Sequence, residues 1–173
     1  DVKANLWVTI KPMVVKDQKQ LLSLTDMEDT RFLHCNIKTL NLLVNCMAAT
    51  KAENEGRDEC VFHRGEIVTE CAHSNISIIK DGVFITHPTD HHILPGITRM
   101  HMIQICKENN IPVDETPFTM EDLKNADEVF ISSATQLCRR AGSLNGENIG
   151  CKDSKLAELI QNCYWDKYME ETK

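Results

Sequence analysis

Apolar and polar residues alternate over several short stretches of the chain, which is the pattern of a half-buried β-strand. Residues 60–63 and 67–70 lie on either side of a glycine turn, and residues 76–79 and 83–86 lie on either side of an Asp-Gly pair. Asp-Gly between two alternating stretches is the strongest short-range signal of a hairpin. The pattern therefore predicts two successive β-hairpins.

Apolar residues spaced three or four positions apart predict helices elsewhere. The expected helices cover residues 40–54, 97–109 and 154–168. Thr119 and Asp122 resemble a capping box, which predicts a further short helix. The apolar faces expected to be buried are Leu42, Leu43, Cys46 and Met47, then Met100, Ile103 and Cys106, and finally Leu156, Leu159, Ile160 and Cys163.

The remaining segments complete this pattern. Residues 111–118 are expected to be extended, residues 128–132 to form a strand, and Asn145-Gly146 to form a turn. Strands gathered as hairpins, with helices between the groups, favour an α+β fold over a doubly wound parallel sheet.

The beginning of the chain has a separate pattern. Leu6–Ile10 predicts a strand, which a Lys-Pro pair ends, and residues 13–20 are polar enough to be a connector. The chain begins at Asp1 rather than at a methionine. We therefore expect this segment to be the edge of a larger protein, with the main domain beginning near Met13.

Composition excludes several classes of protein. The 173 residues are 42% hydrophobic and carry a net charge of −7, with scattered lysines and arginines. This argues against nucleic acid or an anionic membrane as the main partner. No stretch approaches the roughly 20 apolar residues of a membrane helix. The eight cysteines are spread evenly without a CxxC pair, which predicts free thiols in a reducing cytoplasm and no zinc site made by cysteines.

Common catalytic signatures are absent from the sequence: it has no GxGxxG, P-loop, HExxH or GxSxG motif. His87, His91 and His92 lie close together after the second hairpin. A metal site and an ordinary polar loop both account for them, and the sequence predicts no metal.

Four segments occur in a defined order: Asn36–Asn41 (Asn-Ile-Lys-Thr-Leu-Asn), Val68–Glu70, Leu94–Arg99 (Leu-Pro-Gly-Ile-Thr-Arg) and Glu128–Ser133. Together they resemble the class IV aminotransferases, the fold-type IV enzymes that use pyridoxal 5'-phosphate, and most closely the D-amino-acid transaminases among them. The resemblance covers about residues 13–170, which match the larger, C-terminal domain of that family.

The resemblance implies a fold, a reaction and an assembly. The strands are expected to curl into a partly closed barrel with the helices outside. Residues 1–12 would be the last strand of a missing smaller domain, and residues 13–173 the cofactor-binding domain. The expected activity is transfer of the amino group of a D-amino acid, such as D-alanine, to a 2-oxo acid by a cytoplasmic homodimer. Alternatives are an incomplete fragment or half of a split enzyme, and aminodeoxychorismate lyase or branched-chain aminotransferase chemistry.

The resemblance also assigns roles to residues. Lys38 would be the Schiff-base lysine and would carry the proton between the substrate and the cofactor, and we expect it to be buried because desolvation lowers a lysine pKa. Glu70 would keep the pyridine nitrogen protonated. The other expected cofactor contacts are Leu94 against the ring, the Ile97 N–H and the Thr98 hydroxyl on the phosphate, and Arg31 near the phosphate.

Three departures from the family pattern concern substrate and cofactor affinity. His73 lies where the family has a small residue, and would either crowd the pocket or donate a hydrogen bond. Ala134 replaces a threonine that contacts the phosphate. Arg139-Arg140 replaces an apolar segment, and would either bind an anionic substrate or, as we expect, form a solvated turn.

Overall fold

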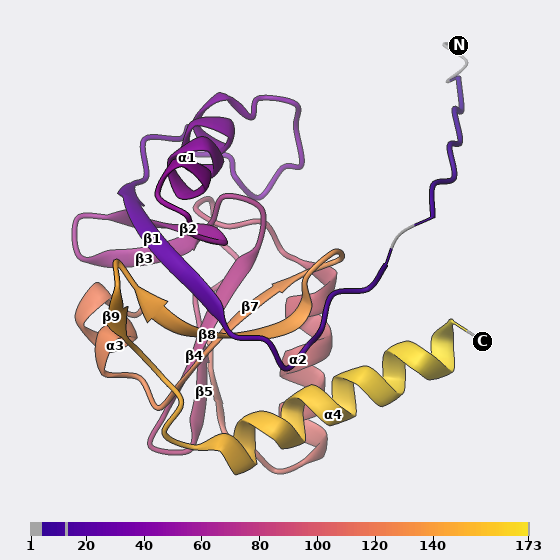
Figure 1. The fold of residues 1–173 in the computed structure, drawn as a ribbon, viewed down its shortest axis with the longest axis vertical. Coiled ribbons are helices and arrows are strands. Elements are labelled where there is room, and N and C mark those ends of the chain that lie inside the picture. The colour runs from indigo at the N-terminus through magenta and orange to yellow at the C-terminus, as the bar shows by residue number, and fades with distance from the viewer. Residues whose placement is uncertain (1–4, 13, 173) are drawn as a thin grey trace.

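Nine strands form one sheet in the described part of the chain, which comprises residues 5–12 and 14–172 of this computed structural model (Figure 1). Four helices from these residues surround the sheet. In chain order the elements are β1 (Leu22–Glu28), α1 (Leu43–Asn54), β2 (Glu59–Arg64), β3 (Ile67–Cys71), β4 (Asn75–Lys80), β5 (Val83–Thr86), α2 (Ile97–Glu108), β6 (Val113–Asp114), α3 (Met120–Asn125), β7 (Glu128–Ser133), β8 (Leu137–Leu144), β9 (Glu147–Asn148) and α4 (Ser154–Glu171).

The sheet is mixed and curled. Its strands follow the order β3-β2-β1-β8-β7-β4-β5-β6, and β9 pairs with β8. Strand β1 is parallel to both of its neighbours and β5 is parallel to β6, whereas the other pairs are antiparallel. The two end strands, β3 and β6, do not pair with each other, so the barrel is only partly closed. The expected α+β class and partly closed barrel are confirmed.

Local turn and cap chemistry places several elements where the sequence predicted them. Strands β2 and β3 form one hairpin and β4 and β5 the other. Asp81 and Gly82 both have positive φ angles, 49° and 76°, as the type I′ turn of a two-residue hairpin requires. Thr119 and Asp122 form a complete capping box at the start of α3. These predictions are confirmed.

Strands β1 and β8 were not predicted, although they are neighbours in the middle of the sheet. Strand β8 contains the Arg139-Arg140 pair, for which we expected a solvated turn. Arg139 is buried and donates to the Gln20 carbonyl oxygen at 3.0 Å. Arg140 pairs at 2.8 Å with the buried carboxylate of Glu128 on β7. The turn prediction is wrong because both arginines lie in a strand and their guanidinium groups are bound by other groups of the protein.

The described part of the N-terminal segment, residues 5–12, is not a strand. It is exposed and runs away from the sheet (Figure 1). The strand predicted over Leu6–Ile10 is therefore wrong in this structure, because a strand needs a hydrogen-bonded neighbour and no described residue pairs with it. Residues 1–4 and Met13 lie outside the described residues, and the division of the chain at residue 12 stays a prediction.

The helices bury narrower faces than we expected. Helix α1 begins at Leu43 rather than Leu40, and its buried residues are Ala48 and Ala52. These small side chains pack on Cys60, Phe62 and Ala72. The larger apolar residues point away from the sheet, so the prediction that they are buried is wrong for Leu42, Leu43, Cys46 and Met47, and likewise for Met100 on α2 and Leu159 on α4.

Two apolar clusters lie on opposite sides of the sheet. One includes residues of β1, β4 and β7 with Leu123 of α3, and the other joins α2 and α4 to residues such as Phe84 and Phe130. All eight cysteines are free thiols. None of the helices in the described residues is both long and apolar enough to cross a membrane.

We expect Leu24→Ala on the central strand β1 to lower the free energy of unfolding by about 2–5 kcal/mol, because Leu24 is completely buried. Leu43→Ala is the control: its side chain is 71% exposed, and the expected change is about 0.5 kcal/mol or less. Urea unfolding of both variants measures the difference. A loss near that of Leu24→Ala in the control would contradict the exposure of this face of α1 in solution.

Candidate active site

Glu70 is the centre of the candidate site. It lies near the end of β3 and is almost fully buried. One carboxylate oxygen accepts a hydrogen bond from Arg31 Nη1 at 2.5 Å. The other accepts from Asn75 Nδ2 at 3.1 Å and from the Leu94 backbone N–H at 2.9 Å. Burial raises the pKa of Glu70 to about 7, and the Arg31 guanidinium opposes this rise. The structure thus brings together three of the predicted residues.

Arg31 is held mainly by carboxylates. Its Nε and Nη2 donate to the two oxygens of Asp29, each at 2.9 Å, and Nη2 also donates to the His92 carbonyl oxygen at 3.2 Å. The guanidinium lies 4.5 Å from the centre of the Phe62 ring. Burial alone would lower the pKa of Arg31, but Asp29 and Glu70 raise it. The predicted role of Arg31 near a phosphate stays a prediction, since its described contacts lead to Glu70.

Asn75 is a site residue to which we assigned no role from the sequence. Its Nδ2 donates to Glu70 and also to the Leu94 carbonyl oxygen at 2.8 Å. Its Oδ1 approaches Gly96 so closely that a Cβ there would lie 2.1 Å away. The asparagine follows Glu70 by five residues, but no local pattern showed that it would bridge β4 to the segment before α2.

The first turn of α2 contains Ile97 and Thr98. No side chain caps this helix, so its first N–H groups and the positive end of the helix dipole remain available for an anion. Thr98 is buried, and its Oγ1 accepts a 3.4 Å hydrogen bond from the Tyr164 hydroxyl. Ile97, Thr98 and Ala134 line one cavity of about 200 Å³. The structure therefore brings the predicted phosphate residues and the departure at Ala134 together.

Basic groups that the sequence did not single out line the same cavity. They are Lys167 on α4 and His101 on α2. Lys167 is 69 positions from Thr98 in the chain, and only the packing of α4 against α2 brings it near. On β7, the Ser132 hydroxyl is buried without a hydrogen-bond partner. Uncapped N–H groups and basic side chains fit a phosphate, and the Glu70 carboxylate fits a pyridine nitrogen.

Lys38 lies in the segment between Arg31 and α1 and is exposed. The expectation that it is buried is wrong in this structure, because no described residue covers this segment. Three apolar neighbours are exposed as well: Ile37, Leu40 and Leu42. The Cys35 N–H donates to the His91 carbonyl oxygen at 2.9 Å, which joins the Lys38 segment to the loop that leads to Leu94.

His73 does not approach Glu70 through any described contact. Its side chain is largely exposed, and Nδ1 lies 3.9 Å from Glu59 Oε1. The nearby Glu59 carboxylate raises the pKa of His73. The two roles that we expected for this residue, crowding the pocket and replacing a serine donor, therefore gain no support from its contacts.

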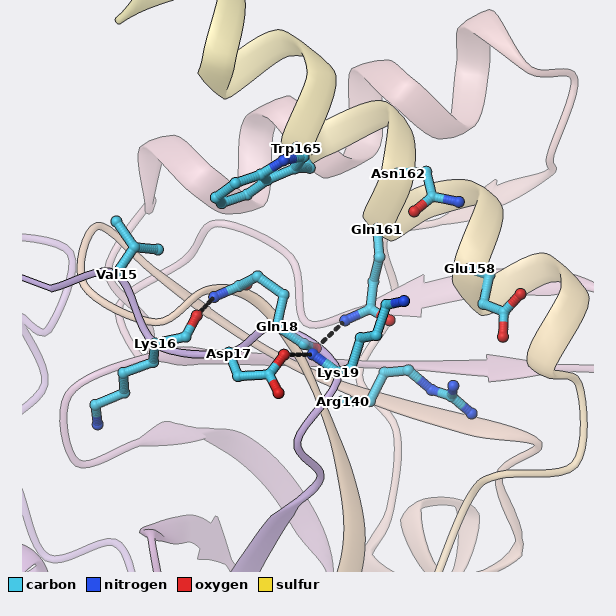
Figure 2. A pocket seen from close by; sticks show the side chains of 10 residues that line it. All are labelled: Val15, Lys16, Asp17, Gln18, Lys19, Arg140, Glu158, Gln161, Asn162 and Trp165. Carbon is cyan, nitrogen blue, oxygen red and sulfur yellow. Dashed lines mark hydrogen bonds between the residues drawn. The ribbon is translucent and has the colours of Figure 1, made fainter.

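A larger cavity, about 560 Å³, lies elsewhere, between residues 15–19 and helix α4 (Figure 2). Trp165 and Val15 stand at one end of it, and Gln161 Nε2 donates to the Gln18 carbonyl oxygen at 2.9 Å across it. Arg140 lines this cavity, but none of the residues predicted to bind the cofactor does, so size alone does not locate the chemistry in this fold.

Comparison with known proteins agrees with this geometry. The model of the class IV amino-transferase family matches residues 4–144. A D-alanine aminotransferase of Listeria monocytogenes serotype 4b is 59% identical over 108 residues, which are 62% of this chain and 37% of that protein. One from Staphylococcus haemolyticus is 40% identical over 89% of this chain and 55% of that protein. The chain thus spans only about a third to a half of these curated relatives.

Solved structures share the fold. The branched-chain amino acid aminotransferase of Escherichia coli superposes with a TM-score of 0.75 at 28% identity, over 83% of this chain and 51% of that one. A putative 4-amino-4-deoxychorismate lyase of Legionella pneumophila gives a TM-score of 0.75 at 26% identity, over 87% of this chain and 58% of that one.

We expect Gly96→Ala to destabilise the protein by about 1–3 kcal/mol, because the added methyl group displaces Asn75 from its contacts. In an Asn75→Ala background the obstacle is gone, so the same substitution should cost much less. Urea unfolding of the two single variants and the double variant yields the coupling free energy. Additive effects would show that Asn75 does not pack against Gly96 in solution.

Proposed function

The chain belongs to the class IV aminotransferase family, and from this premise we propose that it forms the cofactor-binding part of a D-amino-acid aminotransferase. The substrates would be a D-amino acid, such as D-alanine, and a 2-oxo acid. The observation that carries the proposal is the buried Glu70 carboxylate, which Arg31, Asn75 and the Leu94 N–H hold beside the uncapped start of α2. The 59% identity to a D-alanine aminotransferase supports the substrate class.

Five residues would bind pyridoxal 5'-phosphate. When bound, this cofactor supplies an electron sink for the charge that develops at the amino acid Cα. Glu70 would accept the hydrogen bond of the ring nitrogen, and Leu94 would pack against the ring. The Ile97 N–H and the Thr98 hydroxyl would bind the phosphate, and Lys38 would provide the amine.

Glu70 can keep a proton on its partner only while its own carboxylate is ionised. Burial works against ionisation, and Arg31 works for it. We therefore assign Arg31 a positioning role: it would hold Glu70 in place and negatively charged. Asp29 in turn keeps the guanidinium aligned through two hydrogen bonds.

Lys38 would move the proton between the substrate Cα and the cofactor, as a general acid and base. An amine does this best when desolvation brings its pKa towards neutrality. In this structure the lysine is exposed, with Leu40 and Leu43 uncovered beside it. We propose that a second subunit or a further domain covers this surface in the working enzyme, which would also exclude water.

The subunit or domain that would cover the Lys38 surface is part of the proposed assembly. The working form would be a cytoplasmic homodimer, consistent with free thiols, with residues 1–12 belonging to a small domain and residues 13–173 to the cofactor domain. A catalytically incomplete fragment or half of a split enzyme is the alternative. The substrates would be an amino acid and a 2-oxo acid, and no nucleic acid or membrane would take part.

Reduction with borohydride tests the role of Lys38. With pyridoxal 5'-phosphate bound to the protein expressed from its complete reading frame, we expect the stable label on the peptide that contains Lys38. Lys38→Ala should abolish both the label and the activity, while Lys16→Ala, in the connector, is the matched control and should change neither. Mass spectrometry of the digested protein locates the label. A label on another lysine would refute the assignment.

The substrate class has its own test, because likeness to the Legionella lyase leaves aminodeoxychorismate as a second candidate. We expect amino transfer from D-alanine to 2-oxoglutarate at a rate at least about tenfold above that from L-leucine, and no pyruvate release from aminodeoxychorismate. A preference for L-leucine would indicate the branched-chain activity, and pyruvate release would indicate the lyase.

A further inference from the structure

Three side chains that could bind a metal ion face one another in the loop between β5 and α2. They are His87, Asp90 and His92, and one ligand atom from each lies within 4.8 Å of the other two. His91 does not join them, because it is exposed and its ring faces His34 instead. From the sequence alone, His91 was as good a candidate as its neighbours, and only the structure separates them.

The spacing of these side chains leaves room for an ion. His92 Nδ1 lies 3.1 Å from Asp90 Oδ2, and His87 Nδ1 lies 3.8 Å from Asp90 Oδ1. His92 Nδ1 donates to Asp90, and His87 Nδ1 donates to the Pro88 carbonyl oxygen at 2.9 Å. To bind an ion through Nδ1, each ring would therefore carry its proton on Nε2 instead. Two ligand atoms on one tetrahedral zinc ion lie about 3.4 Å apart, given bonds of about 2.1 Å. Shifts of about 1 Å would therefore place all three side chains on one ion.

The charges around the cluster are compatible with a cation. Asp90 contributes a carboxylate, and Arg99, whose Nη2 donates to the His87 carbonyl oxygen, is paired with Glu115 at 2.8 Å. This ion pair offsets the repulsion between Arg99 and a bound ion.

Two arginines hold the backbone at both ends of the cluster. Arg99 Nη2 donates to the His87 carbonyl oxygen at 2.8 Å, and Arg31 Nη2 donates to the His92 carbonyl oxygen at 3.2 Å. Both ends of the cluster are thereby attached to buried arginines, so binding would order few groups. His87 is buried while Asp90 and His92 are partly exposed, which gives an ion access from solvent.

We propose that His87, Asp90 and His92 form a binding site for a divalent transition metal ion such as Zn²⁺. Two imidazole nitrogens and one carboxylate oxygen are the donor types that zinc prefers, and a water molecule would complete the tetrahedron. The ion would tie residues 87–92 together beside the segment that supplies Leu94 to Glu70. The site requires no bound cofactor, and its test is independent of aminotransferase activity.

Calorimetric titration of the metal-free protein with Zn²⁺ tests the proposal. The protein is expressed from its complete reading frame, and its cysteines are blocked first so that thiols do not compete. We expect one ion per chain in the wild type and in the control His91→Ala. His92→Ala and Asp90→Asn should each bind at least about tenfold more weakly. Equal binding by all four proteins, or none by the wild type, would overturn the proposal.

A second measurement uses only the wild-type protein, so a variant that fails to fold cannot affect its result. In protein with ¹⁵N-labelled histidine, Zn²⁺ should shift the ring resonances of His87 and His92 and leave that of His91 unchanged. Equal shifts for all three histidines, or no shift for His87 and His92, would overturn the assignment. Co²⁺ in place of Zn²⁺ should develop visible absorption without the bands of thiolate ligands.

Discussion

A carboxylate buried away from water is the constraint that organises this protein. Glu70 loses its hydration inside the curled sheet, and an unpaired buried charge is too costly to persist. Arg31 supplies the counter-charge, but a buried guanidinium has the same problem and needs Asp29. Breaking such a buried network by removing one member typically costs about 3–5 kcal/mol. The segment after β1, the end of β3 and the loop before α2 are therefore fixed relative to one another.

This network explains why the site has a rigid side and an open side. Asn75, Arg31 and the Leu94 N–H all donate hydrogen bonds to the Glu70 carboxylate and hold it in place. Lys38 lies on an exposed segment, which the Cys35 N–H joins to the His91 carbonyl oxygen. Small residues of α1 pack on the sheet while large apolar ones face outwards. That arrangement is typical of a surface which a partner covers.

The sequence predicted features that depend on short-range chemistry. The Asp-Gly turn, the capping box and the helix after Gly96 each follow from a few neighbouring residues, and the structure has all three. Prediction from the sequence failed where contacts between residues far apart in the chain determine the structure. Arg139 and Arg140 look like a solvated turn until Gln20 and Glu128 are placed beside them. We predicted burial for the apolar residues of α1 because a sequence pattern does not distinguish a residue of the core from one on a surface that a partner would cover. Asn75 and Lys167 belong to the candidate site only through contacts across the fold.

The loop from His87 to Gly96 contacts the residues of the candidate site mainly through backbone hydrogen bonds. The His92 carbonyl accepts from Arg31, the His91 carbonyl accepts from Cys35, and the Leu94 N–H donates to Glu70. Since these contacts use no side chain before Leu94, the residues at positions 87–92 can vary without disturbing the buried carboxylate. That freedom allows two histidines and an aspartate to gather there. The backbone contacts that join the loop to Arg31, Cys35 and Glu70 also fix the positions from which His87, Asp90 and His92 would bind an ion.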